Sequence, residues 1–454
     1  SLAERLKYLG PGMILSASIV GSGELISTTY LGAQAGFILF WVVFFSCLVK
    51  IAVQLEFGKY TIYSGKTTMA AFNDLPGPRL GKANWTIWTW LIIMLLKMLQ
   101  VGGIVGGVAL ILAPLTGAAT LPIWTYAIAI AVSLLIFRGY YAPIERWCII
   151  LIGLFTVFTI ISLISLQWTP YAISAADLKS GLSFDIPNKE MLFFAIAVFG
   201  ITGVGGDEIM AYNYWLIEKG YAANTGPREN SPAWEKRAKG WIHIMYIDAI
   251  LALVVYTTVT AIFYLLGAAV LNAQELLPEK SQLIEVLSTM YTTALGGWAK
   301  GVFMVGAFVV LFSTLLAALA AWSRLFSDAF GQIGMFDFKD LKQRRKAIAI
   351  CAWVIPLIWA TCFIVLKAPT LMVLIGGVAT TAILIIVVFA TAVMRWKWLP
   401  PFLRSGFFYD AALVLSIIAI AAVGFLGLWN TYKSLTKEKA KPAAALSAPG
   451  SPAA

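Results

Sequence analysis

Long apolar segments recur along almost the whole chain, and they constrain the fold more than any other feature of the sequence. A helix needs about 20 apolar residues to cross the hydrocarbon core of a bilayer. Eleven segments meet this need, at approximately residues 10–36, 38–58, 86–113, 122–138, 146–167, 190–219, 240–267, 297–326, 346–366, 369–395 and 408–429. Backbone polar groups in lipid must be bonded within the protein, which an α-helix achieves within one segment. The sequence therefore predicts an all-α polytopic membrane protein.

The composition excludes several classes of function. Only 12% of the residues are charged, whereas soluble domains carry about 25%. The net charge of +11 forms no basic stripe on a soluble domain, so no nucleic-acid partner is expected. No Ser-His-Asp, Cys-His or metal-hydrolase constellation is present, so the chain is not expected to be an enzyme or to hold a cofactor. We expect contacts with membrane lipid, and the sequence shows no sign of an obligate protein partner.

Positive charges between the spans predict the orientation. With the N-terminus in the cytoplasm, most Lys and Arg residues lie in cytoplasmic loops, as the positive-inside rule requires. The outer loops before the C-terminal tail then contain only Lys179, Lys189, Lys280, Lys300 and Lys367. We expect an integral protein of a bacterial inner (plasma) membrane with the C-terminus outside. Residues 1–430 are predicted to form one transmembrane domain, and residues 431–454 a disordered tail of low complexity.

Glycines and acids interrupt two of the spans near their middle. The first contains Gly21-Ser22-Gly23-Glu24, and the sixth contains Gly203-Val204-Gly205-Gly206-Asp207-Glu208. Broken helices at matching positions of two inverted halves indicate the substrate site of a transporter. The alternative is that the glycines only allow close helix packing, but packing does not explain the acids. The spacing of the two breaks fits an inverted repeat of five plus five helices.

These motifs resemble the Nramp (natural resistance-associated macrophage protein) family of divalent metal transporters. The resemblance includes Gly10-Pro11-Gly12, the two breaks and Pro143-Ile144-Glu145-Arg146. It implies a LeuT-like fold, with spans 1–5 (10–167) and 6–10 (190–395) as inverted repeats and an eleventh helix at 408–429.

The chain departs from the usual family pattern at the site itself. The family's Asp-Pro-Gly-Asn is replaced by Gly21-Ser22-Gly23-Glu24, and its Met-Pro-His falls near Val204-Gly205-Gly206. In this respect the chain is more similar to a divergent Nramp-related branch that includes magnesium transporters.

Glu24 is the strongest candidate metal ligand, because an isolated carboxylate in a membrane is costly and usually marks a pathway. Asp207 and Glu208 are further candidates, although side chains about 100° apart on one helix suggest that only one enters the cavity. Each acid could instead stabilise the start of a half-helix. Backbone carbonyl groups near Val20, Gly21 and Gly203 could add oxygen ligands. Loss of the methionine and gain of a carboxylate favour hard ions, Mg²⁺ first and Mn²⁺ second.

Four more polar residues are expected beside these ligands. Ser22, Thr202 and Asn213 could support the site, although hydroxyl and amide groups in membrane helices more often bond a neighbouring helix. Lys97 lies too deep in the third span to reach the interface and should pair with Asp248, Glu56 or an acid of the site.

The predicted function is secondary transport of a hard divalent cation by alternating access around the two breaks. No proton coupling is expected, because the third span has Gln100 where coupled members of the family have acids, and His243 is the only histidine. The alternative is a carrier of a small organic solute, such as an amino acid, on the same fold.

Overall fold

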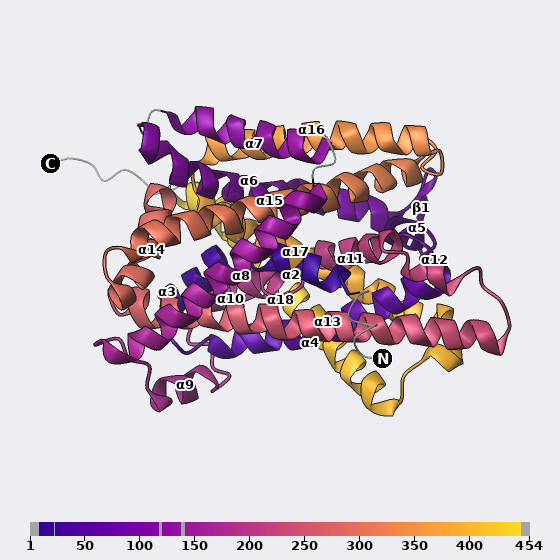
Figure 1. The fold of residues 1–454 in the computed structure, drawn as a ribbon, viewed down its shortest axis with the longest axis horizontal. Coiled ribbons are helices and arrows are strands. Elements are labelled where there is room, and N and C mark those ends of the chain that lie inside the picture. Colours follow the sequence, from indigo (N-terminus) through magenta and orange to yellow (C-terminus); the bar gives the residue numbers. More distant parts are fainter. Residues whose placement is uncertain (1–8, 22, 118–119, 138–140, 446–454) are drawn as a thin grey trace.

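The computed structural model describes residues 9–21, 23–117, 120–137 and 141–445. This part of the chain is mostly helical, with one small hairpin of β1 (Arg79–Leu80) and β2 (Ala83–Asn84). The long helices lie beside one another, with α9 and α14 at one end of the bundle and α5, α12 and β1 at the other (Figure 1). The all-α polytopic fold is confirmed.

The first half of the chain contains the elements up to the loop before residue 189. They are α2 (Pro11–Ile19), the π-helical η1 (Gly23–Thr28), α3 (Thr29–Ala35), α4 (Phe40–Ser64), α5 (Thr68–Asn73), α6 (Trp85–Thr116), α7 (Leu121–Phe137), α8 (Tyr141–Ser165) and α9 (Ala175–Gly181).

The second half begins with the other interrupted span. Its elements are α10 (Lys189–Ile201), α11 (Gly206–Glu218), α12 (Tyr221–Thr225), α13 (Pro232–Leu266), the π-helical η4 (Gly267–Asn272), α14 (Leu283–Leu295), α15 (Ala299–Ile333), α16 (Leu341–Leu366), α17 (Pro369–Val393) and α18 (Phe407–Ala445).

Nine helices in the described part of the chain are long and apolar enough to cross a membrane. The two remaining predicted spans correspond to the interrupted α2–η1–α3 segment and to α7, which has 17 residues. Several helices are longer than their apolar cores; α13, for example, begins at Pro232 rather than near residue 240. Helices continue past the hydrocarbon until a capping residue or a proline ends them, and hydrophobicity alone does not mark that point.

Both predicted breaks are confirmed. The helix α2 ends at Ile19, and η1 begins at Gly23. The helix α10 ends at Ile201, and α11 begins at Gly206 after an irregular segment in which Gly203 has a φ of 68°. This left-handed conformation favours glycine because a Cβ atom would be strained there.

An acid from α13 holds the start of α2. The Asp248 carboxylate accepts hydrogen bonds from the backbone N–H groups of Gly10, at 3.0 Å, and Gly12, at 2.5 Å, and from the Tyr212 hydroxyl, at 3.2 Å. A Cβ atom on Gly12 would lie 2.7 Å from the Asp248 carbonyl oxygen, so glycine permits this close approach. Asp248 therefore has a structural role, because it satisfies the free N–H groups of a helix start and its charge suits the helix dipole.

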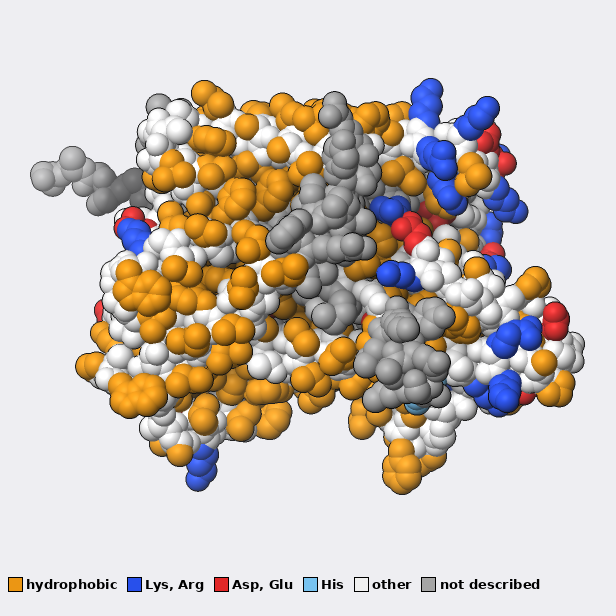
Figure 2. Space-filling model, viewed as in Figure 1, with side chains coloured by type: hydrophobic (Ala, Val, Ile, Leu, Met, Phe, Trp, Pro, Cys, Tyr) orange, Lys and Arg blue, Asp and Glu red, His pale blue; other side chains and the backbone are white. Residues whose placement is uncertain are grey.

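The surface fits a lipid environment. Apolar side chains cover the middle of the molecule, and Lys and Arg side chains gather at the end that carries α5 and α12 (Figure 2). Large apolar side chains such as Ile92, Leu95 and Leu154 are more than half exposed. The chain is an integral membrane protein. The helix α18 extends to Ala445 and residues 446–454 lie outside the described residues, so the tail at 431–454 stays a prediction.

The orientation can be tested with single cysteines at four exposed lysines. We expect Lys179→Cys and Lys280→Cys, at the α9 and α14 end, to react with a membrane-impermeant thiol reagent added outside intact cells. Lys66→Cys and Lys236→Cys, at the other end, should react only after permeabilisation. Reaction of all four cysteines from one side would contradict the inverted repeat.

Candidate functional site

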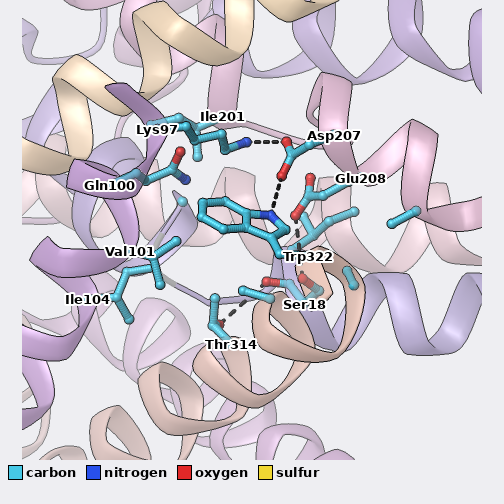
Figure 3. A pocket seen from close by; sticks show the side chains of 15 residues that line it. Ser18, Lys97, Gln100, Val101, Ile104, Ile201, Asp207, Glu208, Thr314 and Trp322 are labelled. Carbon is cyan, nitrogen blue, oxygen red and sulfur yellow. Dashed lines mark hydrogen bonds and ion pairs between the residues drawn. The ribbon is translucent and has the colours of Figure 1, made fainter. Parts of the chain in front are cut away.

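A small polar cavity lies beside both breaks, between α6, α11 and α15 (Figure 3). Its volume is about 40 Å³. The polar side chains that line it are Ser18, Lys97, Gln100, Asp207, Glu208, Thr314 and Trp322. The cavity thus joins residues that are far apart in the sequence, at the place where broken helices of a transporter hold their substrate.

Asp207 is occupied by two partners within the protein. One carboxylate oxygen forms an ion pair with the Lys97 ammonium, and the other accepts a hydrogen bond of 2.9 Å from the Trp322 indole N–H. The carboxylate and the ammonium are both almost fully buried. Lys97 therefore pairs with an acid of the site, one of the three partners considered from the sequence. A cation that binds Asp207 must displace this ammonium or share the carboxylate with it.

Glu208 also lines the cavity, so the expectation that only one of the adjacent acids would enter it is wrong. The cavity surrounds the first turn of α11, and both side chains reach it (Figure 3). One Glu208 oxygen accepts a 2.6 Å hydrogen bond from the Gly205 backbone N–H and so caps the helix start. The other oxygen lies 3.5 Å from the Ser18 hydroxyl. Glu208 is thus both a cap and an available ligand.

Glu24 is fully buried at the start of η1 and faces α13. One carboxylate oxygen accepts a 3.2 Å hydrogen bond from the Thr260 hydroxyl, and the other has no hydrogen-bond partner among the described residues. Glu24 is not among the described residues that line the cavity, although its neighbour Gly23 is. A buried carboxylate oxygen without a partner is rare and costly, so Glu24 remains a candidate ligand for a cation.

The other candidates around the first break lie outside the cavity lining or outside the described residues. Val20 and Gly21 are buried and are not among the described residues lining the cavity. A Cβ atom on Gly21 would lie 1.7 Å from the Thr314 hydroxyl oxygen, so only glycine fits against α15. Ser22 lies outside the described residues.

The candidates around the second break bond to neighbouring helices. The Thr202 hydroxyl lies 3.2 Å from the Thr28 hydroxyl, and the Asn213 amide donates to the Thr68 hydroxyl at 3.1 Å. Gly203 provides the turn between the half-helices. None of these three is among the described residues lining the cavity.

The two polar lining residues on α15, Thr314 and Trp322, were not predicted. Thr314 and Trp322 lie eight residues apart with Ala318 between them, so they share one helix face, and Ala318 also lines the cavity. This i, i+4, i+8 spacing is present in the sequence, but it does not show which helix the face contacts. No group of three or more His, Cys, Asp or Glu residues in the described part of the chain could form a metal cage.

The interrupted helices and the cavity between them give the chain a LeuT-like fold, which is a fold of membrane transporters. Within that class, the chain belongs to the Nramp family, because the model of the natural resistance-associated macrophage protein-like family matches residues 12–430. The expectation of a transporter rather than an enzyme is confirmed by these matches.

Individual relatives are distant. The chain is 25% identical over 337 residues to a divalent metal cation transporter, MntH, of Xanthomonas campestris, covering 74% of this chain and 70% of that protein. The manganese transporter of Eremococcus coleocola, solved with an aromatic bis-isothiourea compound, superposes with a TM-score of 0.63 at 15% identity, covering 93% of this chain and 86% of the other. MhsT with L-phenylalanine has a TM-score of 0.51 at 16% identity, covering 92% and 98%.

Proposed function

We propose that this protein transports a hard divalent cation, Mg²⁺ first and Mn²⁺ second, by alternating access around the cavity at the two breaks. The observation that carries the proposal is the pair of carboxylates, Asp207 and Glu208, at the start of α11 inside that cavity. Family membership and the names of the relatives, a divalent metal cation transporter and a manganese transporter, support it.

The ligand chemistry favours a hard ion. Carboxylate, hydroxyl and amide oxygens are available from Glu208, Ser18, Thr314 and Gln100, and no sulfur or imidazole ligand is among the described lining residues. Val204, where the family's methionine falls, is fully buried and is not among them either. Such oxygens select Mg²⁺, Ca²⁺ or Mn²⁺ over softer metals.

The size of the cavity fits an ion that keeps part of its water. A water molecule needs about 10–15 Å³ of cavity volume, so the cavity of about 40 Å³ holds about three water-sized groups. Because Mg²⁺ usually retains several waters and uses one or two carboxylates, Asp207 and Glu208 supply enough protein charge. Glu24, buried behind Gly23, would add a further carboxylate as the ion moves through the breaks.

We expect uptake of Mg²⁺ or Mn²⁺ into proteoliposomes to proceed without acidification of the lumen. The described cavity lining has no histidine, and His243 is exposed on α13, so the side chain that most often relays protons near neutral pH is missing there. An inside-negative potential of about 100 mV would drive uptake by about 2.3 kcal/mol per elementary charge. The measurement combines ion-sensitive and pH-sensitive dyes in the lumen.

Empty liposomes and liposomes clamped at zero potential are the controls. Metal-dependent proton entry above the empty-liposome background would contradict uncoupled transport. Repeating the assay with Asp248→Asn would then show whether the acid that holds α2 carries the proton.

A carrier of a small zwitterion is the second candidate, and Lys97 favours it. A cavity that contains an ammonium, a carboxylate and an indole ring could bind the two charges of an amino acid. MhsT, which shares the fold, binds L-phenylalanine. The cavity volume of about 40 Å³ argues against a solute of that size, so the cation is the better candidate.

A further inference from the structure

Lys50 is a fully buried lysine on α4 whose ammonium lies against backbone oxygens. It donates to the carbonyl oxygens of Phe199, Gly200 (3.4 Å) and Thr202 (2.8 Å), and it lies 4.7 Å from the centre of the Phe199 ring. The Ser46 hydroxyl, one turn earlier on α4, lies 3.0 Å from the Phe199 oxygen and 2.8 Å from the Thr202 oxygen. We call these three carbonyl groups the α10 carbonyl cage.

The break in the sixth span creates this cage. The last carbonyl groups of a helix have no partner within the helix and carry the negative end of its dipole. Because α10 stops at Ile201 in the middle of the membrane, no water is expected to satisfy them there. Carbonyl oxygens at the C-terminal end of a half-helix are also the groups that bind monovalent cations in broken-helix transporters.

Lys50 differs from the other buried cations of the described residues in lacking an acidic partner. Lys97 pairs with Asp207, Lys59 pairs with Glu56, and Arg395 pairs with Glu56 and Asp410. No carboxylate of the described part of the chain lies within 4.0 Å of the Lys50 ammonium. The carbonyl cage therefore balances its charge, as it would balance that of a bound metal ion.

We propose that the α10 carbonyl cage is a monovalent-cation site and that the Lys50 ammonium is the cation that permanently fills it. The protein then carries its own cation at this position and needs no Na⁺ or K⁺ there. The formal charges fit this role, because the three acids Glu24, Asp207 and Glu208 outnumber the two lysines Lys50 and Lys97 by one. Removing Lys50 leaves an excess of two, which a monovalent cation in the cage reduces to one again.

The test opens the cage with Lys50→Met, which keeps an unbranched side chain and removes the charge. Thermal unfolding of the purified variant is measured in Na⁺, K⁺ and choline salts at equal ionic strength. We expect the Tm of the variant to fall in choline and to rise by several degrees with Na⁺ or K⁺ in a saturable manner, because a bound ion stabilises the folded state. The wild-type Tm should be the same in all three salts.

Lys59→Met is the matched control. It also removes a buried lysine from α4, but this lysine pairs with Glu56 and does not contact the carbonyl cage. Its Tm should not depend on the cation. A second variant, Lys50→Gln, keeps a hydrogen-bond donor without the charge and should also gain stability from Na⁺ or K⁺. The proposal is overturned if the wild type depends on Na⁺, or if both Lys50 variants are indifferent to the cation or fail to fold in every salt.

An uptake assay with Mg²⁺ or Mn²⁺ tests whether the cage affects transport. This assay rests on the proposed function, because it needs the transported ion. Uptake by the wild type should be equal in Na⁺ and choline, whereas uptake by Lys50→Met should depend on Na⁺ or K⁺. The unfolding experiment needs no transported substrate, so its result stands even if the protein carries an organic solute. If the protein takes up no divalent ion but the Tm of the Lys50 variants depends on Na⁺ or K⁺, the proposed function is wrong and the proposed cation site still holds.

Discussion

Glu208→Gln is expected to weaken binding of Mg²⁺ and Mn²⁺ to the purified protein by about 10- to 100-fold. Glu208 is the cavity carboxylate without an ammonium partner, so it is the first available charge for an incoming cation. Loss of a charged hydrogen-bonding or coordinating group costs about 1.5–3 kcal/mol, which corresponds to that change in affinity. The amide can still accept the hydrogen bond from Gly205, so folding should change little. Isothermal titration calorimetry measures the effect.

The matched control is Glu285→Gln, an exposed acid on α14 that pairs with Lys300 outside the cavity. It should leave the affinity unchanged. Glu24→Gln tests the second carboxylate in the same assay and in proteoliposomes, where we expect divalent transport to fall more than stability does. Unchanged binding and transport in both Glu208→Gln and Glu24→Gln would remove the basis for a metal site at the breaks.

Lys97→Met should increase the affinity for Mg²⁺ and Mn²⁺ by at least about 10-fold. The ammonium competes with the cation for Asp207 and repels it within the same buried cavity. At an effective dielectric constant of about 20, one pair of charges about 4 Å apart interacts by about 4 kcal/mol, which exceeds the 1.4 kcal/mol of a tenfold change. Calorimetry with Mg²⁺, Mn²⁺ and a set of amino acids measures both candidate substrates.

The same variant separates the two candidate functions. A carrier of zwitterions needs the Lys97 ammonium to bind a substrate carboxylate, so Lys97→Met would abolish amino-acid binding if that were the function. Lys300→Met, at an exposed lysine beside Glu285, is the control for a general effect of charge. If Lys97→Met loses the binding of an amino acid, and neither the wild type nor the variant binds a divalent cation, the protein is a carrier of an organic solute rather than of a metal ion.

The sequence was sufficient for the features that depend on local composition. Apolar length placed the spans, and glycines next to Glu24 and Asp207 located both breaks, because a break in a membrane helix needs backbone freedom and a polar environment. Lys97 was predicted to need a carboxylate because no interface lies within its reach.

The sequence was not sufficient where a role depends on how helices pack. Adjacent acids on α11 both reach the cavity, which residues of α6 and α15 line together with the first turn of α11, and helical periodicity cannot show this. The hydrogen bond from the Trp322 indole N–H to Asp207 likewise depends on how α11 and α15 pack, and no sequence pattern shows it. The partners of the Lys50 ammonium are backbone carbonyl groups, which no side-chain pattern in the sequence reveals.

The contact between Asp248 and the start of α2 has a consequence for movement. Asp248 belongs to the second helix of the second repeat and holds the broken helix of the first repeat. Lys50 belongs to the second helix of the first repeat and holds the broken helix of the second repeat. Each of these side chains carries the charge that its helix end attracts. The Asp248 carboxylate is negative and lies at an amino end, and the Lys50 ammonium is positive and lies at a carboxyl end. Each repeat thus holds the broken helix of the other, so a movement of α2 or α10 must break one of these contacts or carry a helix of the other repeat with it.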